Sequence, residues 1–375
     1  MERFAFVIHP LQAEDFARKY PFTRALPPRW VEAAFRRVPP LVVSHITGIR
    51  SAVGKQAEGW FIGLPLTPRV LLASDPEFVY RRLVRCAEIA HRLGARILGL
   101  GAFTKIVGDR GVTVAARSPI PVTTGNSYTA ATAVEGALVA AQRLDIVPSR
   151  ARAAVVGATG AIGAACARLL ARQVGQLTLV ARGRERLEQL ADQIRAESAC
   201  SVEATDRVRE AVRGADIVLT VTSATTVLVE PEDLKPGAVV CDVARPRNVS
   251  REVYARRDDV LVLDGGVIQV PGEVDFGLDF GFPPGTCEAC MAETMALALE
   301  GRYESYTVGG DVRLDRVEEI ARIARKHGFR LAGFRRFERA IGDEEVERIR
   351  KRTRGLRVAG APRFEGFEGA GGGAV

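Results

Sequence analysis

The sequence predicts an α/β protein with a doubly wound parallel sheet, a smaller N-terminal α/β domain and C-terminal helices. Three observations support this fold class. Short apolar stretches alternate with segments of helical spacing along most of the chain. A glycine-rich turn near residue 157 joins one apolar stretch directly to a helical segment. The 375 residues, of which 47% are hydrophobic, are enough for two domains with cores of their own.

The first domain, an α/β substrate-binding domain, is predicted over residues 1–146. It opens with a strand at Phe4–His9, and the stretch 76–95 has helical spacing and ends at a Gly-Ala break. A short buried strand, "RILGLGAF", follows. The segment "TTGNSYTAATAVEGALVAAQRLDI" then predicts a turn at Gly125 and a long helix after it.

The second domain is predicted over residues 147–285. The segment "RAAVVGATGAIGAACARLLARQV" reads as strand, glycine turn and helix, and four further apolar stretches read as strands of the same parallel sheet. C-terminal helices at 287–300 and 313–327 are predicted within residues 286–335. Residues 336–375 form a basic extension and a Gly-rich tail.

Composition narrows the class of protein. The formal net charge is +8, but the arginines are scattered among glutamates, and no basic stripe is interleaved with aromatic residues, so we expect no nucleic-acid partner. We expect no membrane span, because the apolar stretches are too short or too rich in glycine. No signal-peptide pattern is seen, and the six cysteines form no regular framework. A cytoplasmic protein is therefore expected.

The glycine turn predicts a dinucleotide site of the Rossmann type. Its spacing is G-x-x-G-x-x-G, which allows a tight turn and a close approach of the backbone to a pyrophosphate at the helix N-terminus. The alternative is a plain strand-to-helix turn in another α/β protein. The residues predicted to contact the cofactor here are Gly157, Ala158, Thr159, Gly160, Ala161, Ile162 and Gly163.

The end of the next strand predicts NADPH rather than NADH. An NAD site usually has a carboxylate there, which binds the ribose 2′-hydroxyl. This sequence has "LVARGRERL" instead, with Arg182 at that point, Arg184 close by, and no carboxylate before Glu185. An arginine can pair with a 2′-phosphate. The alternative is that Arg182 is simply a surface residue at the start of a helix.

Further cofactor contacts are predicted where other strands end, because cofactors bind at the C-terminal edge of such a sheet. These candidates are Thr222, Asp242, Val243, Gly265 and Gly266.

Two cysteines lie three residues apart in "GTCEACMAET". With Thr286 as N-cap of the predicted helix, Cys287 and Cys290 would share one helix face, and the helix N-terminus would lower the pKa of a thiol. Glu288 and Glu293 act in the opposite direction. Core packing, a catalytic thiol and a redox pair all remain open at this point. No second pair exists at ligand spacing, so no metal site is predicted.

Several segments together resemble the cyanobacterial long-chain acyl-[acyl carrier protein] reductases. They are "LGAFTKIVGDRG", "TTGNSYTA", "GATGAIGAAC", "LVARGRERL", "KPGAVVCDVARPRNVS", "LDGGVIQ" and "CMAETMALALEGRYESYTVGGDVRLDRVEEIARIARKHGFR". They follow in the order of that family and extend over roughly residues 60 to 330. Those enzymes reduce a fatty acyl thioester to an aldehyde with NADPH.

The resemblance implies a role for three residues. It implies that Cys290, in "ACMAE", takes the acyl group from acyl carrier protein or coenzyme A, and that NADPH reduces the resulting thioester. A tetrahedral intermediate needs hydrogen-bond donors, and the loop with Thr124 and Asn126 is a candidate source of them. The alternative reading of that loop is a capped helix start with no ligand. The roles of Cys287, Lys105 and His327, and the oligomeric state, stay open.

Two other functions compete. A shikimate-, quinate- or amino-acid-type dehydrogenase would share the architecture and use a Lys–Asp pair, and Lys105 and Asp109 are near each other in the sequence. The usual Asn-x-Thr-x-Pro-x-x-Lys signature of the first of these is absent. A non-enzymatic NADPH-binding redox sensor would instead switch by a disulfide between Cys287 and Cys290.

Overall fold

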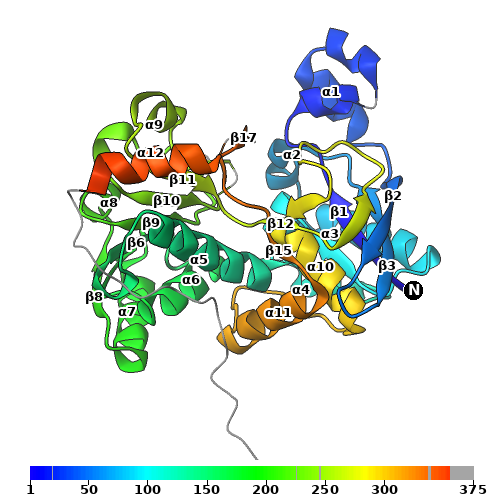
Figure 1. Cartoon of the computed structure of the whole chain (residues 1–375). Coiled ribbons are helices and arrows are strands. Elements are labelled where there is room, and N and C mark those ends of the chain that lie inside the picture. Colours follow the sequence, from blue (N-terminus) through cyan, green and yellow to red (C-terminus); the bar gives the residue numbers. More distant parts are fainter. Residues whose placement is uncertain (19, 225, 245, 337–338, 355–375) are drawn as a thin grey trace, which may run out of the picture. The chain divides into compact units, whose positions relative to one another are not determined.

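The chain folds into two compact units (Figure 1). The computed structural model describes residues 1–354, apart from residues 19, 225, 245, 337 and 338. Unit 1 contains Met1–Thr129 and Val267–Ala332, and unit 2 contains Ala130–Gly266 and the chain from Gly333 onward. The predicted Gly-rich tail lies outside the described residues.

Unit 2 has a six-stranded, wholly parallel sheet in the order β11-β10-β9-β6-β7-β8. In chain order this is 3-2-1-4-5-6, the arrangement of dinucleotide-binding Rossmann folds. The predicted fold class is confirmed. The strands are β6 (Arg152–Val156), β7 (Gln176–Val180), β8 (Ser201–Thr205), β9 (Ile217–Thr220), β10 (Val239–Asp242) and β11 (Leu261–Asp264).

Helices connect these strands, because parallel neighbours need crossover connections. The helices are α6 (Ala161–Ala171), α7 (Arg184–Glu197), α8 (Val208–Arg213) and α9 (Arg251–Arg256), with single turns η4 (Pro148–Arg150) and η5 (Pro231–Asp233). After Gly333 come β16 (Arg335–Arg336), β17 (Arg339–Ala340) and α12 (Asp343–Thr353). The interior of the sheet is apolar; β9, for example, is buried over its whole length. This agrees with a parallel sheet covered on both faces.

Unit 1 has a mixed six-stranded sheet in the order β13-β2-β3-β1-β4-β5. Strands β3, β1, β4 and β5 are parallel; at one edge β2 is antiparallel to β3, and β13 is antiparallel to β2. Its strands are β1 (Glu2–Ile8), β2 (Leu41–Arg50), β3 (Gln56–Gly63), β4 (Leu98–Leu100), β5 (Val122–Thr123) and β13 (Gly272–Asp275). A small sheet consists of β12 (Val267–Gln269), β14 (Thr286–Glu288) and β15 (Arg330–Leu331).

The helices of unit 1 include the long amphipathic helix predicted at 76–95. Asp75 caps it, a proline occupies its first position, and Val79, Leu83, Cys86 and Ala90 bury one face. The full set is η1 (Ala13–Arg18), η2 (Pro21–Ala25), α1 (Pro28–Phe35), α2 (Pro68–Ala73), α3 (Pro76–Arg92), η3 (Ala102–Lys105), α4 (Val112–Arg117), α10 (Ala289–Glu300) and α11 (Leu314–His327). Helix α5 (Asn126–Arg143) begins in unit 1 and continues into unit 2.

Helix α10 is the centre of unit 1. It packs against β1, β4 and α11, and every residue except the last is buried. A helix that is apolar on all sides is suited to such a place. Its buried polar residues, above all Glu293, therefore need partners within the protein.

The segment that follows β11 differs from the sequence expectation. Residues 267–285 are predicted to belong to the dinucleotide domain, but β13 pairs with β2, and Val267–Ala332 belongs to unit 1 with the N-terminal residues. Pairing between strands more than 200 residues apart leaves no local pattern. The domain limits 1–146, 147–285, 286–335 and 336–375 stay a prediction. In the described residues no helix is both long and apolar enough to cross a membrane.

Candidate active site and nucleotide turn

Cys290 lies in the first turn of α10, which begins two residues later than predicted. Thr286 does not cap the helix; its hydroxyl donates a hydrogen bond to the carbonyl oxygen of Pro283. Residues 286–288 instead form β14, in which Cys287 pairs with Ile268 of β12, and Glu288 is the N-cap position. The prediction that Cys287 and Cys290 share a helix face is therefore wrong, because strand pairing takes up residues 286–288.

The predicted loop with Thr124 and Asn126 lies directly against Cys290. Gly125 has a φ of +71°, and a Cβ on it would lie 2.2 Å from the Cα of Cys290. Only glycine fits this contact, because both the backbone angle and the space exclude a side chain. The structure thus brings together two segments that are more than 160 residues apart.

Thr124 and Asn126 differ in what their side chains bind. The backbone N–H of Thr124 donates to the carbonyl oxygen of Thr307 over 2.8 Å, and its hydroxyl donates to the same oxygen over 3.0 Å. Asn126 is 5% exposed, and its Oδ1 is buried without a hydrogen-bond partner in the described residues. A buried amide oxygen without a partner is unusual in a folded protein, and a bound ligand is one explanation for it. Of the two, Asn126 keeps its side chain available to a ligand.

Glu293, one turn after Cys290, is a buried acid that sequence reasoning treated only as a nearby charge. Its Oε1 accepts from the hydroxyls of Thr123 at 2.5 Å and Thr307 at 3.1 Å, and its Oε2 accepts from the backbone N–H of Tyr128 at 2.8 Å. It therefore ties α10 to β5 and to the start of α5. The available signal was a single carboxylate inside a helix that is otherwise apolar on all sides.

The electrostatic surroundings raise the pKa of the Cys290 thiol to about 12. Burial is the largest cause; the charge of Lys105 opposes it, and Glu288 and Glu293 add to it. The Cys290 thiol donates to Oε2 of Glu288 over 3.7 Å. The predicted lowering of this pKa by the helix N-terminus is outweighed by burial. The thiol therefore needs a base in order to react.

Lys105 is the cationic group whose charge most favours ionised Cys290. Its Nζ donates to the carbonyl oxygen of Thr124 over 3.4 Å. His9 is a second basic residue near Glu288, but burial lowers its pKa to about 4, against opposing effects of Pro10, Asp15 and Glu288. His9 accepts a hydrogen bond at Nε2 from the N–H of Phe103, which suits a neutral imidazole.

Two residues whose roles were open lie in structural contacts. Cys287 is fully buried, and burial raises its pKa well above the usual range. His327, the last residue of α11, is bonded through Nδ1 to the Ser51 hydroxyl at 2.7 Å and through Nε2 to Oε2 of Glu300 at 2.7 Å. His327 thus joins α11 to the β2–β3 turn and to the end of α10.

The glycine turn has the geometry expected for binding a phosphate. Gly157 has a φ of +91°, and a Cβ on Gly163 would lie 2.1 Å from the carbonyl oxygen of Gly157. Gly160 is the N-cap of α6, and no side chain caps this helix. The N–H groups of the first turn, from Ala161 onward, have no acceptor within the helix. The backbone N–H groups at the turn and at the start of α6 therefore form a set of hydrogen-bond donors that fits the pyrophosphate of a dinucleotide.

The rest of the predicted turn lies where the sequence placed it. Ala158 is buried, and its N–H donates to the carbonyl oxygen of Val180 over 3.1 Å. Thr159 and Ile162 are half-buried, on the turn and in the first helical turn.

Arg182 and Arg184 lie just beyond the end of β7, and both are exposed. In the described part of the chain neither forms an ion pair, although many of the other arginines do. Two uncommitted guanidinium groups next to the glycine turn are available to an anion.

The predicted residues after β9 and β10 form one hydrogen-bonded network. The hydroxyl of Thr222 is bonded to Oδ1 of Asn248 at 2.7 Å. Asp242 is buried and accepts from the Thr220 hydroxyl at 2.6 Å and from the N–H groups of Ala244, Asn248 and Val249. The carboxylate of Asp242 thus holds the loops at this sheet edge in place. Asn248 was missed, since an asparagine in "RPRNVS" carries no local signal of such a contact.

Gly265 and Gly266 follow β11 at the same edge. A Cβ on Gly265 would lie 2.6 Å from a methyl carbon of Val243, so the two predicted positions are in direct contact. Gly266 has a φ of +77°. Among the described residues, no group of three or more His, Cys, Asp or Glu side chains is placed to hold a metal ion.

The chain is similar to several known proteins. A family model described as shikimate / quinate 5-dehydrogenase matches residues 139–264. Aminotransferase PigE of a Serratia species is 36% identical over 285 residues, which are 75% of this chain and 33% of PigE. The chain thus spans about a third of PigE. The crystal structure of L-tryptophan dehydrogenase from Nostoc punctiforme covers 95% of this chain and 89% of its own, with 11% identity and a TM-score of 0.42.

A relationship over most of the chain is seen with a reductase. The long-chain acyl-[acyl-carrier-protein] reductase of Synechococcus elongatus is 31% identical over 306 residues, which are 78% of this chain and 87% of that enzyme. The match therefore extends well beyond the dinucleotide-binding sheet. The chain belongs to the long-chain acyl-[acyl-carrier-protein] reductase family and is an oxidoreductase with an NAD(P)-binding fold.

Proposed function

We propose that this protein reduces a long-chain acyl thioester, carried by acyl carrier protein or coenzyme A, to a fatty aldehyde with NADPH, through an acyl group on Cys290. The observation that carries the proposal is the contact between the Cys290 thiol and the Glu288 carboxylate, next to the Gly125 backbone. The relationship to the Synechococcus reductase supports the same substrate class.

In the first step Glu288 accepts the thiol proton while Sγ of Cys290 attacks the thioester carbonyl carbon. The bond from this carbon to the carrier sulfur breaks, and the carrier thiol leaves with the proton that Glu288 held. A base is needed because the pKa of the thiol is about 12. The charge of Lys105 favours the sulfur anion as it develops.

The oxygen of the tetrahedral intermediate needs donors. The Asn126 side chain lies beside Gly125, and its Oδ1 is buried without a hydrogen-bond partner in the described structure. The same amide carries the Nδ2 donor, and we propose that Nδ2 donates to the oxygen of the intermediate. The Thr124 hydroxyl is bonded to Thr307 and holds the loop instead. Thr124 therefore becomes a positioning residue.

A reduced nicotinamide, when bound at the glycine turn of unit 2, supplies the hydride that converts the acyl group to the aldehyde. Cys290 Sγ then leaves the carbonyl carbon as a thiolate and regains a proton through Glu288. Overall, one thioester, one hydride and one proton give one aldehyde and one carrier thiol. The test is to incubate the protein with palmitoyl thioester and look for an acyl group on Cys290 that NADPH releases as aldehyde.

The dehydrogenase alternative is less well supported. The shikimate / quinate 5-dehydrogenase model matches only residues 139–264, which exclude Lys105 and Asp109. In the described structure no ion pair joins these two residues: Lys105 bonds to Thr124, and Asp109 accepts from Thr113. An aminotransferase activity is not proposed either, because about two thirds of PigE lies outside the match.

Replacing Glu288 with glutamine is expected to slow the transfer of the acyl group to Cys290 by about 10²-fold or more, because the proton acceptor is lost. The same change removes a negative charge that raises the pKa of the thiol, so iodoacetamide should alkylate Cys290 faster at pH 7–8. The two rates therefore move in opposite directions. Single-turnover acylation and alkylation rates measure them.

Exposed Glu273 on β13 is the matched control, and Glu273→Gln should change neither rate. If Glu288→Gln speeds both alkylation and acylation, Glu288 is only a repelling charge and the proposed base is wrong.

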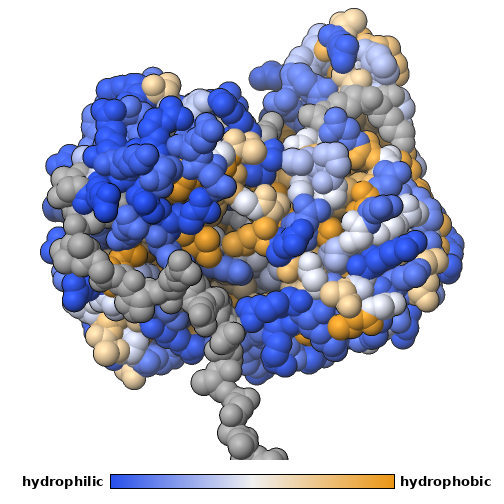
Figure 2. All heavy atoms as spheres, viewed as in Figure 1, coloured by the Kyte–Doolittle hydropathy of each residue, from blue (hydrophilic) through white to orange (hydrophobic). Residues whose placement is uncertain are grey.

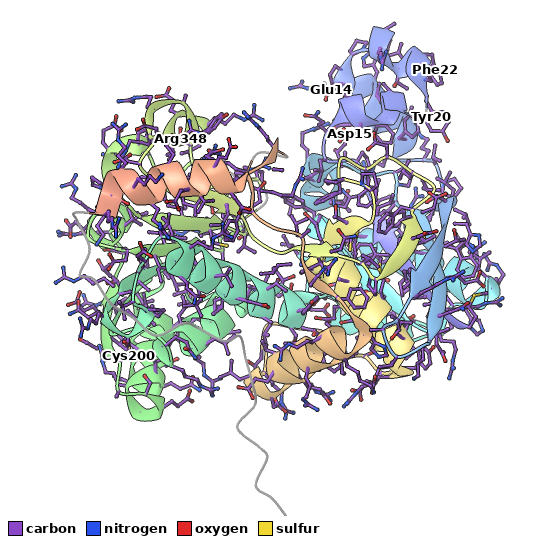
Figure 3. All side chains as sticks on the ribbon, viewed as in Figure 1. Glu14, Asp15, Tyr20, Phe22, Cys200 and Arg348 are labelled. Atoms are coloured by element: carbon purple, nitrogen blue, oxygen red, sulfur yellow. The ribbon has the colours of Figure 1, made fainter. Side chains whose placement is uncertain are left out.

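Replacing Arg182 and Arg184 together with alanine is expected to raise the KM for NADPH by about 10- to 100-fold and to leave the KM for NADH nearly unchanged. The reason is the loss of charge-assisted hydrogen bonds to the 2′-phosphate. Steady-state kinetics with both nucleotides measure the effect. Arg348→Ala on α12 is the control, and Figure 3 labels this exposed arginine. Helix α12 is held by an ion pair between Arg352 and Asp258, which lies just before β11. An equal rise for both nucleotides would refute the assignment to the 2′-phosphate.

A further inference from the structure

The segment between β1 and β2 forms a small lobe of unit 1, made of η1, η2 and α1, which we call the N-terminal lobe (Figure 1). It has its own aromatic core, in which the ring of Phe16 stacks on Phe35 with centroids 3.9 Å apart and Tyr20 lies 5.3 Å from Phe35. Glu32 fixes the lobe to the start of α2, through the Thr67 hydroxyl at 2.5 Å and Nε of Arg69 at 3.0 Å. The lobe therefore has a defined fold with its own packed core.

Large apolar side chains of the lobe face solvent. Phe22 is 65% exposed, Leu26 41% and Trp30 71%. They recur every four residues, with exposed Ala25, Pro27 and Pro28 between them. Figure 3 labels Tyr20 and Phe22 on the lobe, and Figure 2 shows hydrophobic spheres at its tip beside hydrophilic ones. Exposed apolar groups gathered in this way mark a binding surface.

The charge of this surface is positive. Arg24 and Arg29 are exposed between the apolar side chains, and Arg36 and Arg37 follow at the end of α1. The lobe has three acids: Glu14 and Asp15 in η1, and Glu32, which is buried and paired with Arg69. Between residues 16 and 40 the exposed charged side chains are therefore basic. A partner for this face must therefore be apolar and negatively charged.

The lobe lies at the same sheet edge as the reactive thiol. Strands β1, β4 and β5 are parallel, so their C-terminal ends meet at one edge. The lobe follows β1, Lys105 follows β4, and Thr124 follows β5. His9, at the base of the lobe, accepts a hydrogen bond from the N–H of Phe103 just before Lys105. A partner of the lobe would thus be next to the site of acyl transfer.

We propose that the N-terminal lobe docks on an anionic lipid bilayer, with Phe22, Leu26 and Trp30 in the interface and Arg24 and Arg29 at the lipid phosphates. Tryptophan, phenylalanine and leucine beside arginines are the residues with which peripheral proteins bind such surfaces. Apolar side chains that project from the lobe can enter the fluid interior of a bilayer without a matching pocket. A folded acidic protein would have to provide such a pocket. The surface is argued independently of the proposed function. Only the benefit of docking rests on that function, since a long-chain aldehyde released at the bilayer would pass into lipid.

The test uses the full chain and vesicles of phosphatidylglycerol and phosphatidylcholine. The chain has two tryptophans, and Trp60 is stacked on His45 with centroids 5.1 Å apart. Trp60→Phe therefore leaves Trp30 as the sole tryptophan, and its emission should shift to shorter wavelength as anionic vesicles are added. Pure phosphatidylcholine should give at least a tenfold weaker response, and salt should weaken binding to the anionic vesicles.

Variants separate this surface from the active site. The triple variant Phe22→Ser, Leu26→Ser and Trp30→Ser should lower binding in a vesicle sedimentation assay by about 100-fold or more. Leu72→Ser, on α2 and 54% exposed in the wild type, is the matched control and should bind normally. Turnover of a short, water-soluble acyl thioester should be the same in all three proteins.

The outcomes are distinct from those of the proposed function. Vesicle binding that depends on the lobe, in a protein that reduces no thioester, would leave this inference standing and overturn the function. Equal binding by wild type and triple variant would overturn the inference. It would also be overturned if the triple variant bound vesicles normally but lost self-association or binding to acyl carrier protein, since the surface would then belong to a protein partner.

Discussion

Replacing Cys290 with alanine is expected to abolish the acyl-enzyme and to lower the rate of aldehyde formation by at least about 10³-fold, because no other group replaces a lost nucleophile. The measurement is mass spectrometry of the peptide that holds Cys287 and Cys290, after incubation with palmitoyl thioester, together with the NADPH-dependent release of aldehyde. NADPH binding should be unchanged, because the glycine turn belongs to unit 2 and Cys290 to unit 1.

Cys287→Ala is the matched control. Cys287 has the same chemistry three residues away, but it is fully buried in β14, and burial raises the pKa of its thiol well above the usual range. The control should keep both the adduct and the turnover. If Cys290→Ala still forms aldehyde at the normal rate, the reduction needs no covalent intermediate. Turnover of a hydroxy acid or an amino acid by both variants would favour the dehydrogenase alternative.

Replacing Glu293 with alanine is expected to lower the free energy of unfolding by roughly 2–5 kcal/mol, since three buried donors lose their acceptor. The donors are the hydroxyls of Thr123 and Thr307 and the N–H of Tyr128. Glu293→Gln keeps the shape and an acceptor oxygen, so we expect a smaller loss. Urea unfolding monitored by circular dichroism measures both variants.

The pH dependence separates a carboxylate from a merely polar group at position 293. Burial raises the pKa of Glu293, and the hydrogen bonds from Thr123, Tyr128 and Thr307 and the charge of Lys105 only partly oppose this. As pH rises above about 4.5, the unfolded chain releases the proton before the folded chain does. The folded state therefore loses stability relative to the unfolded state with rising pH, until the raised pKa is passed. The stability of Glu293→Gln relative to that of the wild type should therefore increase over the same pH range.

Glu300, at the other end of α10, is a control of opposite sign. Burial acts to raise its pKa, but hydrogen bonds from Lys326 and His327 and their charges lower it overall. The stability that ionised Glu300 contributes is thus present above about pH 4.5 and is lost on acidification. The stability of Glu300→Gln relative to that of the wild type should therefore decrease as pH rises. If the stability of Glu293→Gln relative to wild type does not change from pH 4 to 8, the assigned shift of Glu293 is wrong.

Much of unit 2 was readable from the sequence because its signals are local. The strand at residues 152–156, the turn from Gly157 to Gly163 and the following helix are consecutive, and backbone sterics and hydrogen bonding within a few residues specify them. Strand β8, "SVEAT", was missed: it is a short edge strand with two exposed residues and has no apolar run.

By itself, the sequence determined the fold class, the glycine turn, the arginines after the second strand of the sheet, and the candidate thiol. Only the tertiary structure decided the surroundings of that thiol. It placed Gly125 against Cys290, joined Glu293 to Thr123 and Thr307, and turned residues 286–288 into a strand rather than a helix cap. The contacts of Gly125 with Cys290 and of Thr123 with Glu293 join residues more than 160 positions apart, and the contacts of Thr307 and of residues 286–288 form only when the intervening loops fold back. Their free energies come from burial, pairing and hydrogen bonds that exist only after folding, so no local pattern records them.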